Sequence, residues 1–204
     1  MRNIFVVGLG NFGFHCAKKL EGKADVTAID IRREPIQRIG SHVARAVVGD
    51  ATRTELLQEL GIEFSDAVVI SMGTSLEASI LVTLHAKTLG AREIFAKAVS
   101  DDHAEILTRM GATRVLHPER EIAENLAISI SRTNIVDYLR LHESFAIIEV
   151  TAPEAFEGHS LLDLNIRSRF EVTVIGIFRD GDRFINPAPK IVIEKGDRLA
   201  VLGD

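Results

Sequence analysis

The chain has 204 residues, of which 46% are hydrophobic, and its formal net charge of −5 comes from acidic and basic residues that are interspersed. The length predicts one large domain, or a domain with a small addition, around a packed core, and the charge disfavours a nucleic acid partner. No apolar run reaches the roughly eighteen residues of a membrane span and no signal peptide precedes the first strand, so we expect a soluble, cytoplasmic protein. The single cysteine, Cys16, excludes intrachain disulfides and thiolate metal clusters.

The first thirty residues predict a strand, a tight turn and a helix. An apolar run at residues 4–7 leads into a glycine turn, and an amphipathic run at 12–20 follows it; the turn is Gly8-Leu9-Gly10-Asn11-Phe12-Gly13. Gly8 suits a turn that other residues resist, Gly10 lets backbone N–H groups approach a phosphate, and Gly13 lets helix and strand pack closely. The N-terminus of the helix then faces the anion with its N–H groups and positive dipole end.

A second strand, residues 26–29, ends in an acid that completes this motif. Asp30 follows Gly10 by about 20 residues, which is the distance at which a carboxylate accepts hydrogen bonds from the 2′-OH and 3′-OH of a ribose. A 2′-phosphate would be repelled there, so NADP is disfavoured. The pattern therefore predicts nucleotide binding; the alternative is a Rossmann-like scaffold that has lost its ligand.

The third strand, residues 44–48, again ends in a glycine and an acid, Gly49-Asp50-Ala51-Thr52. Ligands of open α/β sheets lie outside the carboxyl ends of the strands, so Asp50 and Ala51 are expected beside the base or ribose. The alternative is that Asp50 or Thr52 caps the following helix, residues 55–60.

The fourth and fifth strands contribute small residues and a lysine to the same edge. Residues 67–70 form an apolar run without alternation, as in a strand buried on both faces, and Ser71-Met72-Gly73-Thr74-Ser75 then keeps the cleft open before a helix at 76–89. Residues 94–98 form the fifth strand. Its Lys97 either reaches a phosphate in the cleft or extends to solvent at the edge of the sheet.

A helix at residues 104–110 and a short strand at 114–116, which reaches His117-Pro118-Glu119, complete five or six successive βα units. Crossovers of this kind are right-handed and join parallel strands, so the fold class is α/β with a doubly wound, Rossmann-like parallel sheet. The polar residues Asp30, Asp50, Lys97 and Glu119 all fall at carboxyl ends of strands.

The pattern changes after the sixth strand. Residues 121–141 predict one long helical stretch with Ile122, Leu126 and Ile130 on one face, and Thr133-Asn134 as a point where it divides. We expect part of this apolar face to pack on a second copy of the protein rather than on its own sheet. A small α+β domain follows, with strands at 145–150, 173–178 and 198–202, and it is too small to bury much surface alone.

The sequence lacks the features of an enzyme. Its seven histidines show no metal-ligand spacing, and there is no nucleophile motif and no paired-carboxylate signature. We therefore expect no catalysis, with the nucleotide acting as a signal. Two alternatives are a small NAD(H)-dependent oxidoreductase and a redox sensor that binds NAD(H) without chemistry.

Taken together, the glycine turn, Asp30, the 49–52 turn, the His117-Pro118-Glu119 segment and residues 161–175 resemble the RCK (regulator of potassium conductance) family, in particular the KtrA- and TrkA-type cytosolic subunits of bacterial potassium uptake systems. The resemblance covers the whole chain, with an N-terminal RCK domain at 1–141, crossover helix included, and a C-terminal RCK domain at 142–204. It implies dimers in an octameric ring beneath a membrane-embedded potassium transporter, at the inner face of the membrane. Nucleotide exchange would reshape the ring and gate ion flow.

The resemblance also implies ATP or ADP as ligand, with NAD(H) as the alternative, and a set of contacts beyond the glycine turn. These are Asp30, Ile31, Arg32, Asp50, Ala51, Met72, Gly73, Thr74, Lys97, Ala98, Val99 and His103. Glu119 would reach a cation, Mg²⁺ or Na⁺, between phosphates of neighbouring subunits. Asn11 departs from the arginine that many relatives carry, which removes a charge-assisted contact to the terminal phosphate of ATP.

The C-terminal domain resembles the part of KtrA that binds cyclic di-AMP at a dimer interface. The matching positions are Leu161, Leu162, Asn165, Arg167, Val174 and Ile175, with Thr173 in place of an asparagine and Pro189 as a wall for a base. Arg167 would hold a phosphate. The alternative is that these residues form only a hydrophobic dimer core.

Overall fold

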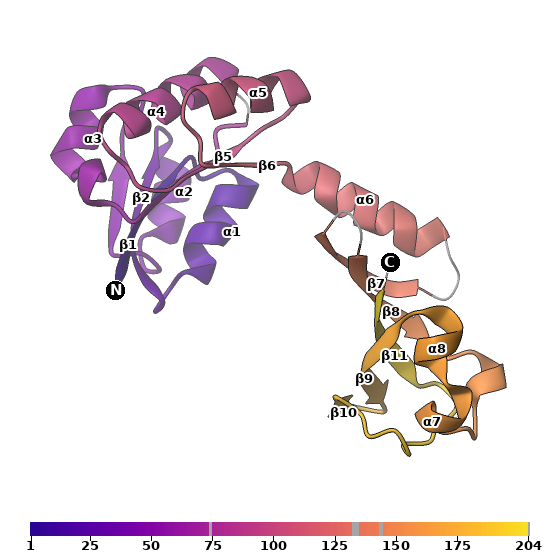
Figure 1. Cartoon of the computed structure of the whole chain (residues 1–204). Coiled ribbons are helices and arrows are strands. Elements are labelled where there is room, and N and C mark those ends of the chain that lie inside the picture. The colour runs from indigo at the N-terminus through magenta and orange to yellow at the C-terminus, as the bar shows by residue number, and fades with distance from the viewer. Residues whose placement is uncertain (74, 132–134, 143–144, 204) are drawn as a thin grey trace. The chain divides into compact units, whose positions relative to one another are not determined.

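The computed structural model describes residues 1–73, 75–131, 135–142 and 145–203, and it divides into two compact units (Figure 1). The units are Met1–Pro118 and Glu119–Asp204. This division comes earlier than the domain boundary predicted after residue 141, so the segment that follows Pro118 is grouped with the second unit.

The first unit is built on a six-stranded parallel sheet with strand order β3-β2-β1-β4-β5-β6. The strands are β1 Arg2–Val7, β2 Ala24–Asp30, β3 Arg45–Val48, β4 Ala67–Ile70, β5 Ile94–Lys97 and β6 Arg114–Leu116. The strand order reverses between β1 and β4, which creates the crevice in which such sheets bind ligands. The predicted doubly wound parallel sheet is confirmed.

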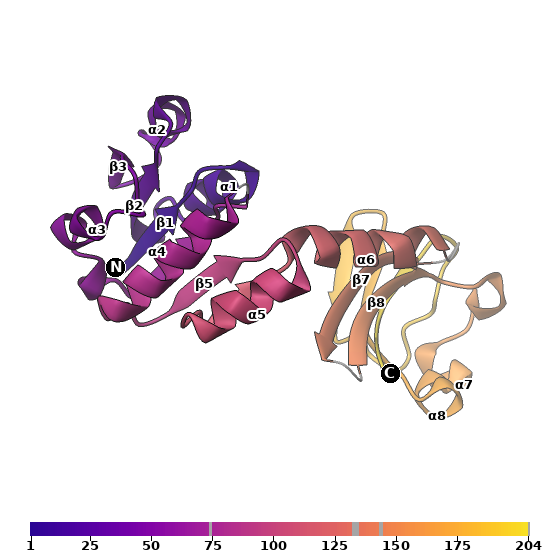
Figure 2. The same ribbon diagram turned by 90° about the horizontal axis from the view of Figure 1, so that it is seen from above.

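Helices cover both faces of this sheet (Figure 2). They are α1 Asn11–Lys19, α2 Arg33–Ile39, α3 Thr54–Leu60, the 3₁₀ turn η1 Ile62–Phe64, α4 Leu76–Thr88 and α5 Asp101–Arg109. Phe5 and Val7 of β1 pack in one core cluster with residues of α3, α4 and α5, whereas Ile4 and Val6 pack in another with residues of α1 and α2. The unbroken apolar run in β1 is therefore the consequence of burial on both faces.

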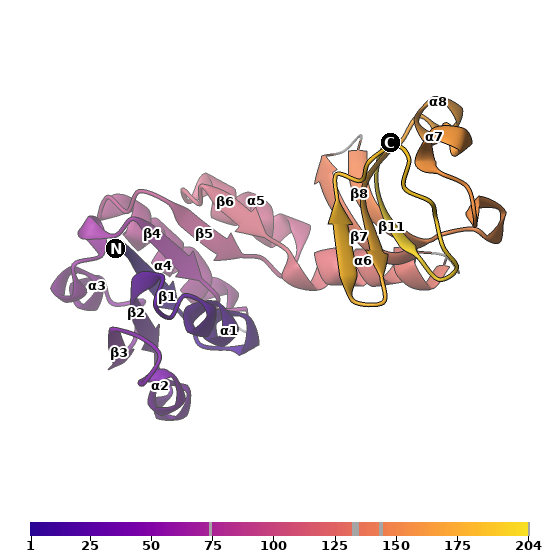
Figure 3. The same ribbon diagram turned by 90° about the horizontal axis from the view of Figure 1, so that it is seen from below.

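The second unit contains a five-stranded antiparallel sheet with strand order β10-β9-β11-β8-β7. Figure 3 labels three of these strands, β7, β8 and β11. Its strands are β7 Ile135–His142, β8 Phe145–Thr151, β9 Thr173–Arg179, β10 Asp182–Ile185 and β11 Arg198–Gly203. Its helices are α6 Pro118–Ser131, the 3₁₀ turn η2 Glu154–Phe156, α7 Leu161–Leu164 and α8 Ile166–Phe170. Ile177, Ile193 and Leu199 are buried at the centre of its core.

The predicted long helix at residues 121–141 is wrong in its second half. Helix α6 ends at Ser131, and residues from Ile135 onward form β7, which pairs antiparallel with β8. The backbone groups of this segment are satisfied by the neighbouring strand, and its β-branched and aromatic residues suit a sheet. The predicted division at Thr133-Asn134 lies outside the described residues. Ile122, Leu126 and Ile130 do share a face of α6 and are exposed.

Among the described residues, no helix has both the length and the apolar character needed to cross a membrane.

Candidate functional site

The glycine turn after β1 contains two glycines that the fold requires and one that leaves space for a ligand. Gly8 has φ +88°, and a Cβ there would lie 2.6 Å from the carbonyl oxygen of Ser71. A Cβ on Gly13 would lie 2.0 Å from the carbonyl oxygen of Gly8, so the first turn of α1 packs directly on the strand end. A Cβ on Gly10, by contrast, would meet no protein atom within 4 Å. The space above Gly10 is thus open to a bulky group.

The N-terminus of α1 is suited to an anion at this open space. Gly10 is the N-cap residue, with extended backbone (φ −65°, ψ −174°), and it supplies no side-chain hydrogen bond to the first turn. No acidic residue lies in that turn, so the positive end of the helix dipole is not neutralised by the helix itself. Leu9 is buried and Phe12 packs against the core, so these two residues can offer a ligand mainly their backbone groups.

Asp30, at the end of β2, is a buried carboxylate held by the glycine turn. Its Oδ2 accepts a hydrogen bond from the backbone N–H of Leu9 at 2.7 Å, and its Oδ1 accepts one from the backbone N–H of Arg32 at 2.8 Å. The Arg32 guanidinium donates two further bonds, at 3.1 and 3.2 Å. Burial would raise the pKa of Asp30, but the hydrogen bonds from the Arg32 side chain and from both backbone N–H groups outweigh it and hold the pKa below its ordinary value.

These contacts leave Asp30 ionised, as an acceptor for hydroxyl groups. The side chain of Arg32 is 62% exposed and that of Asp30 only 6%, so the guanidinium can leave for solvent while the carboxylate stays in place. Two ribose hydroxyls would then replace the two guanidinium bonds, with the backbone bonds from Leu9 and Arg32 retained. Ile31, between them, is exposed and available to a base.

The turn after β3 lies beside Asp30, because the N–H of Gly49 donates to the carbonyl oxygen of Asp30 at 3.0 Å. Asp50 does not cap the next helix, nor does Thr52, since α3 begins at Thr54 with Arg53 as its N-cap residue. Instead, Asp50 accepts hydrogen bonds from the Thr52 hydroxyl at 2.7 Å and backbone N–H at 3.0 Å, and these two bonds lower its pKa. The capping alternative is wrong, and Ala51 is buried in the core.

Lys97 points toward the end of β4. Its Nζ would lie 3.5 Å from a Cβ built on Gly73, and the strand that carries it, β5, is flanked by β4 and β6. Lys97 thus does not lie on an edge strand, and its contact with a phosphate stays a prediction. Met72 is half-buried and approaches Gly8, where a Cβ would lie 3.1 Å from its Cγ. Thr74 lies outside the described residues.

His103 belongs to the packing between α4 and α5. It is 2% exposed, its Nε2 lies 2.8 Å from the Ser79 hydroxyl, and its Nδ1 accepts from the backbone N–H of Val99 at 3.4 Å. Burial, with a smaller effect of the His117 charge, lowers its pKa, so the ring is neutral. His103 thus supports the loop after β5, where Ala98 is buried and Val99 exposes half of its surface.

The predicted cation site at Glu119 involves phosphates of neighbouring subunits, so a single chain does not test it. Within the parts of the chain that the structure describes, no three His, Cys, Asp or Glu side chains come together as a metal site. Glu119 lies on α6 in the second unit, and its role beside bound phosphates stays a prediction.

The residues predicted for a cyclic dinucleotide lie at α7, α8, β9 and a loop of the second unit. The backbone N–H of Leu162 donates to the carbonyl oxygen of Pro189 at 2.7 Å, and the N–H of Asn186 donates to that of Ile175 at 3.0 Å. These bonds place α7 and the first half of β9 against the same loop. Other predicted members are Leu161, Asn165, Arg167, Thr173 and Val174, of which Asn165 takes a left-handed conformation (φ 47°) between α7 and α8.

Two serines that support predicted site residues were not themselves predicted as ligand contacts. Ser71 follows β4, is 7% exposed, and its N–H donates to the carbonyl oxygen of Val7 at 2.8 Å; its position after an apolar strand is a signal that points to it. Ser79, the partner of His103, lies within α4 and carries no such signal, because only the packing of two helices brings the pair together.

Comparison with known proteins gives the same two-part organisation. Residues 4–118 match the TrkA-N domain and residues 145–204 match the TrkA-C domain. The Ktr system potassium uptake protein C of Bacillus subtilis is 36% identical over 97% of this chain and 90% of the relative. The Ktr system potassium uptake protein A of that bacterium is 34% identical over the same shares, 97% and 90%. The crystal structure of the GsuK RCK domain has a TM-score of 0.58 at 24% identity and covers 99% of this chain and 44% of that chain.

Proposed function

The chain belongs to the RCK family of paired TrkA-N and TrkA-C domains, and from this premise we propose that it is a nucleotide-binding regulatory subunit of a membrane-embedded potassium transporter. The Ktr potassium uptake proteins, which match it over nearly their whole length, support the role in potassium transport. We place the protein in the cytoplasm, at the inner face of the membrane through its transporter partner.

The observation that carries nucleotide binding is the link between the glycine turn and Asp30. A bond of 2.7 Å from Leu9 fixes the ionised carboxylate next to the turn, and the space above Gly10 is open. One end of this arrangement suits a phosphate at the helix N-terminus, and the other suits the hydroxyls of a ribose. A molecule with both groups, an adenine nucleotide, would use both at once.

We propose ATP and ADP as the exchanging ligands, with NAD(H) as the alternative. A carboxylate that accepts from ribose hydroxyls serves all three, and Asn11 offers no charge that would favour the terminal phosphate of ATP. Lys97, whose ammonium lies next to Gly73, is the cationic side chain placed for a phosphate. Mg²⁺ or Na⁺ at Glu119 and cyclic di-AMP in the second unit belong to the same proposal.

Substitution of Gly10 by alanine tests this proposal directly. The backbone at Gly10 suits alanine and the added methyl meets no protein atom, so the fold should be unchanged, whereas a bound phosphate would collide with it. We expect affinities for ATP, ADP and NADH, measured by calorimetric titration, to fall at least tenfold. Gly40→Ala is the matched control, because its Cβ would meet only the carbonyl oxygens of Ile36 and Gln37 in α2, at ordinary contact distances of 3.5 and 3.6 Å. Unchanged affinities in a folded Gly10→Ala variant would show that no phosphate lies at this turn.

Self-association would let nucleotide binding in each chain change the shape of a larger assembly. We propose that the stripe of Ile122, Leu126 and Ile130 on α6 packs against a second copy, and that dimers assemble into an octameric ring. Ile130 is 77% exposed, an unusual state for isoleucine unless it contacts a partner. Leu126→Glu should dissociate the assembly in light scattering, whereas Glu124→Gln on the same helix should not. An octamer that survives Leu126→Glu would place the interface elsewhere.

We propose that the bound nucleotide undergoes no chemistry. Changing a gate from mostly closed to mostly open takes about 5.5 kcal/mol of differential binding, which several coupled sites can share. Incubation of the protein with NADH and carbonyl substrates should give no turnover. Potassium uptake by host cells that lack the chain should be restored by the wild type and not by Gly10→Ala. Steady NADH oxidation would instead support the oxidoreductase alternative.

A further inference from the structure

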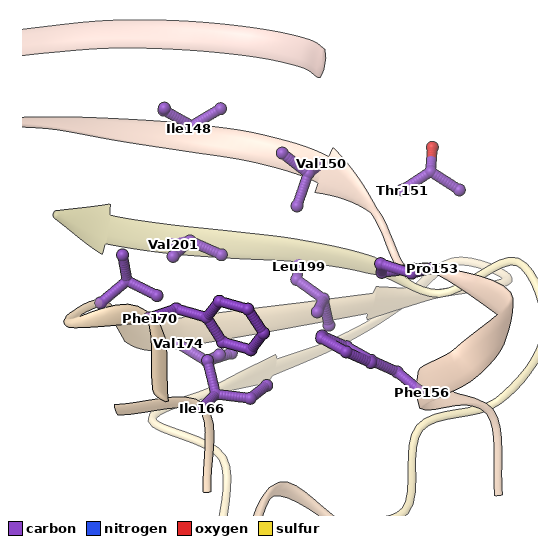
Figure 4. Close-up of a pocket in the computed structure, with 11 residues that line it drawn as sticks. Ile148, Val150, Thr151, Pro153, Phe156, Ile166, Phe170, Val174, Leu199 and Val201 are labelled. Carbon is purple, nitrogen blue, oxygen red and sulfur yellow. The ribbon is translucent and has the colours of Figure 1, made fainter. Parts of the chain in front are cut away.

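The second unit contains an apolar cavity that the nucleotide cleft does not include. Its volume is about 300 Å³, and its walls come from β8, β9, β11, η2 and α8 (Figure 4). Val150 pairs with Leu199 and Ile148 pairs with Val201 across β8 and β11, so these four side chains lie on one face of the sheet. They form one wall of the cavity.

The opposite wall contains two phenyl rings, Phe156 from η2 and Phe170 from the end of α8 (Figure 4). Their centroids are 6.0 Å apart and the ring planes are inclined by 46°. Helix α8 has five residues, and the chain then turns at Glu171, which has φ 57°, to enter β9. The helical layer is therefore too short to cover β8, and the uncovered part of the sheet becomes a concave, ring-walled space.

The chemistry of the lining selects the ligand. No ionisable side chain belongs to the described residues that line the cavity, and Figure 4 shows the hydroxyl of Thr151 directed away from it. A charged ligand would lose its hydration without gaining a partner, and a water molecule would lack the polar partners it needs. An apolar cavity of roughly 150 Å³ binds benzene, so a cavity of about 300 Å³ suits a molecule of about two rings.

We propose that this cavity is a binding site for a small neutral apolar molecule, with the bulk of two fused rings or of an aliphatic chain of similar volume. The site adjoins the residues predicted for a cyclic dinucleotide, but its lining shares only Val174 with them. Its walls stand on two sides of a space that is partly open to solvent, and its volume of about 300 Å³ suits a small molecule held between the phenyl rings and the strands better than the broad surface of a protein partner. The proposal does not depend on nucleotide binding.

The test uses prodan, a neutral two-ring fluorophore whose emission shifts to the blue in an apolar site, titrated into the full-length protein. We expect saturable binding with one site per chain. Val150→Phe and Val201→Phe each fill the cavity and should weaken binding at least tenfold without lowering the melting temperature. Val192→Phe is the matched control: its side chain is 43% exposed and outside the lining, so it should bind prodan like the wild type.

Competition separates the apolar site from nonspecific binding. Naphthalene should displace prodan, whereas 2-naphthalenesulfonate, which adds a charge, should not. The proposal is overturned if the wild type does not bind prodan saturably, or if both filling variants bind it unchanged while folded. It is also overturned if the wild type binds no prodan and Val201→Phe changes the oligomeric state, because the cavity is then a contact between copies.

Discussion

Replacement of Asp30 by alanine separates the structural role of this carboxylate from its role toward a ligand. In the wild type it accepts hydrogen bonds from the backbone N–H groups of Leu9 and Arg32 and from the Arg32 guanidinium. The alanine variant leaves the buried Leu9 N–H without this acceptor. Asp30→Asn keeps the shape and one acceptor oxygen but removes the charge.

The cost to the fold follows from the bonds lost. A buried donor left unsatisfied costs about 1–3 kcal/mol, and we expect Asp30→Ala to lower the free energy of unfolding by about 2–4 kcal/mol and Asp30→Asn by about half as much. Because the pKa of Asp30 is lowered in the folded state, its contribution is complete above its ordinary pKa of about 3.9 and is lost as the pH falls below that value. The difference in stability between wild type and Asp30→Ala should therefore shrink below about pH 4.

The cost to binding is comparable or larger. Two ribose hydroxyls donating to a charged acceptor contribute about 1.5–3 kcal/mol each, about 3–6 kcal/mol together, so both variants should bind ATP, ADP and NADH at least a hundredfold more weakly. Chemical denaturation measures the first effect and calorimetric titration of the folded variants measures the second. If Asp30→Asn stays folded and binds these nucleotides like the wild type, Asp30 only holds the glycine turn and the assignment of the ribose site is wrong.

Three other substitutions address the framework of the two units. Gly13→Ala should destabilise the first unit strongly, with a fall in melting temperature that Gly10→Ala does not show, because its Cβ would lie 2.0 Å from the Gly8 carbonyl oxygen. His103 has a lowered pKa in the folded state, so stability should decrease as the pH falls below about 6.5, and urea unfolding of His103→Gln should lack this decrease. Asp197 is fully buried and lies 2.7 Å from the guanidinium of Arg179. Asp197→Ala leaves that guanidinium without its buried partner, so denaturant titrations should show a free energy of unfolding lower by about 3–5 kcal/mol. An effect below about 1 kcal/mol would contradict this.

The sequence by itself determined the architecture of the first unit. Unbroken apolar runs such as residues 67–70 can be buried only between two layers, and their alternation with helices requires parallel strands and right-handed crossovers. The glycine spacing and the distance to Asp30 predicted that the turn after β1 lies at the end of β2, and the hydrogen bond from Leu9 to Asp30 confirms this. These signals are local, so they can be recognised in the sequence without knowing which distant segment packs against them.

The tertiary structure decided what depends on partners distant in sequence. Residues 135–142 are a strand because β8 pairs with them, although their apolar spacing also allowed a helix. His103 is a core residue because Ser79, 24 positions earlier, lies against it. The apolar cavity exists because α8 ends before it covers β8. In each case the free energy of a side chain depends on which distant groups exclude water from it, and only the folded chain brings those groups together.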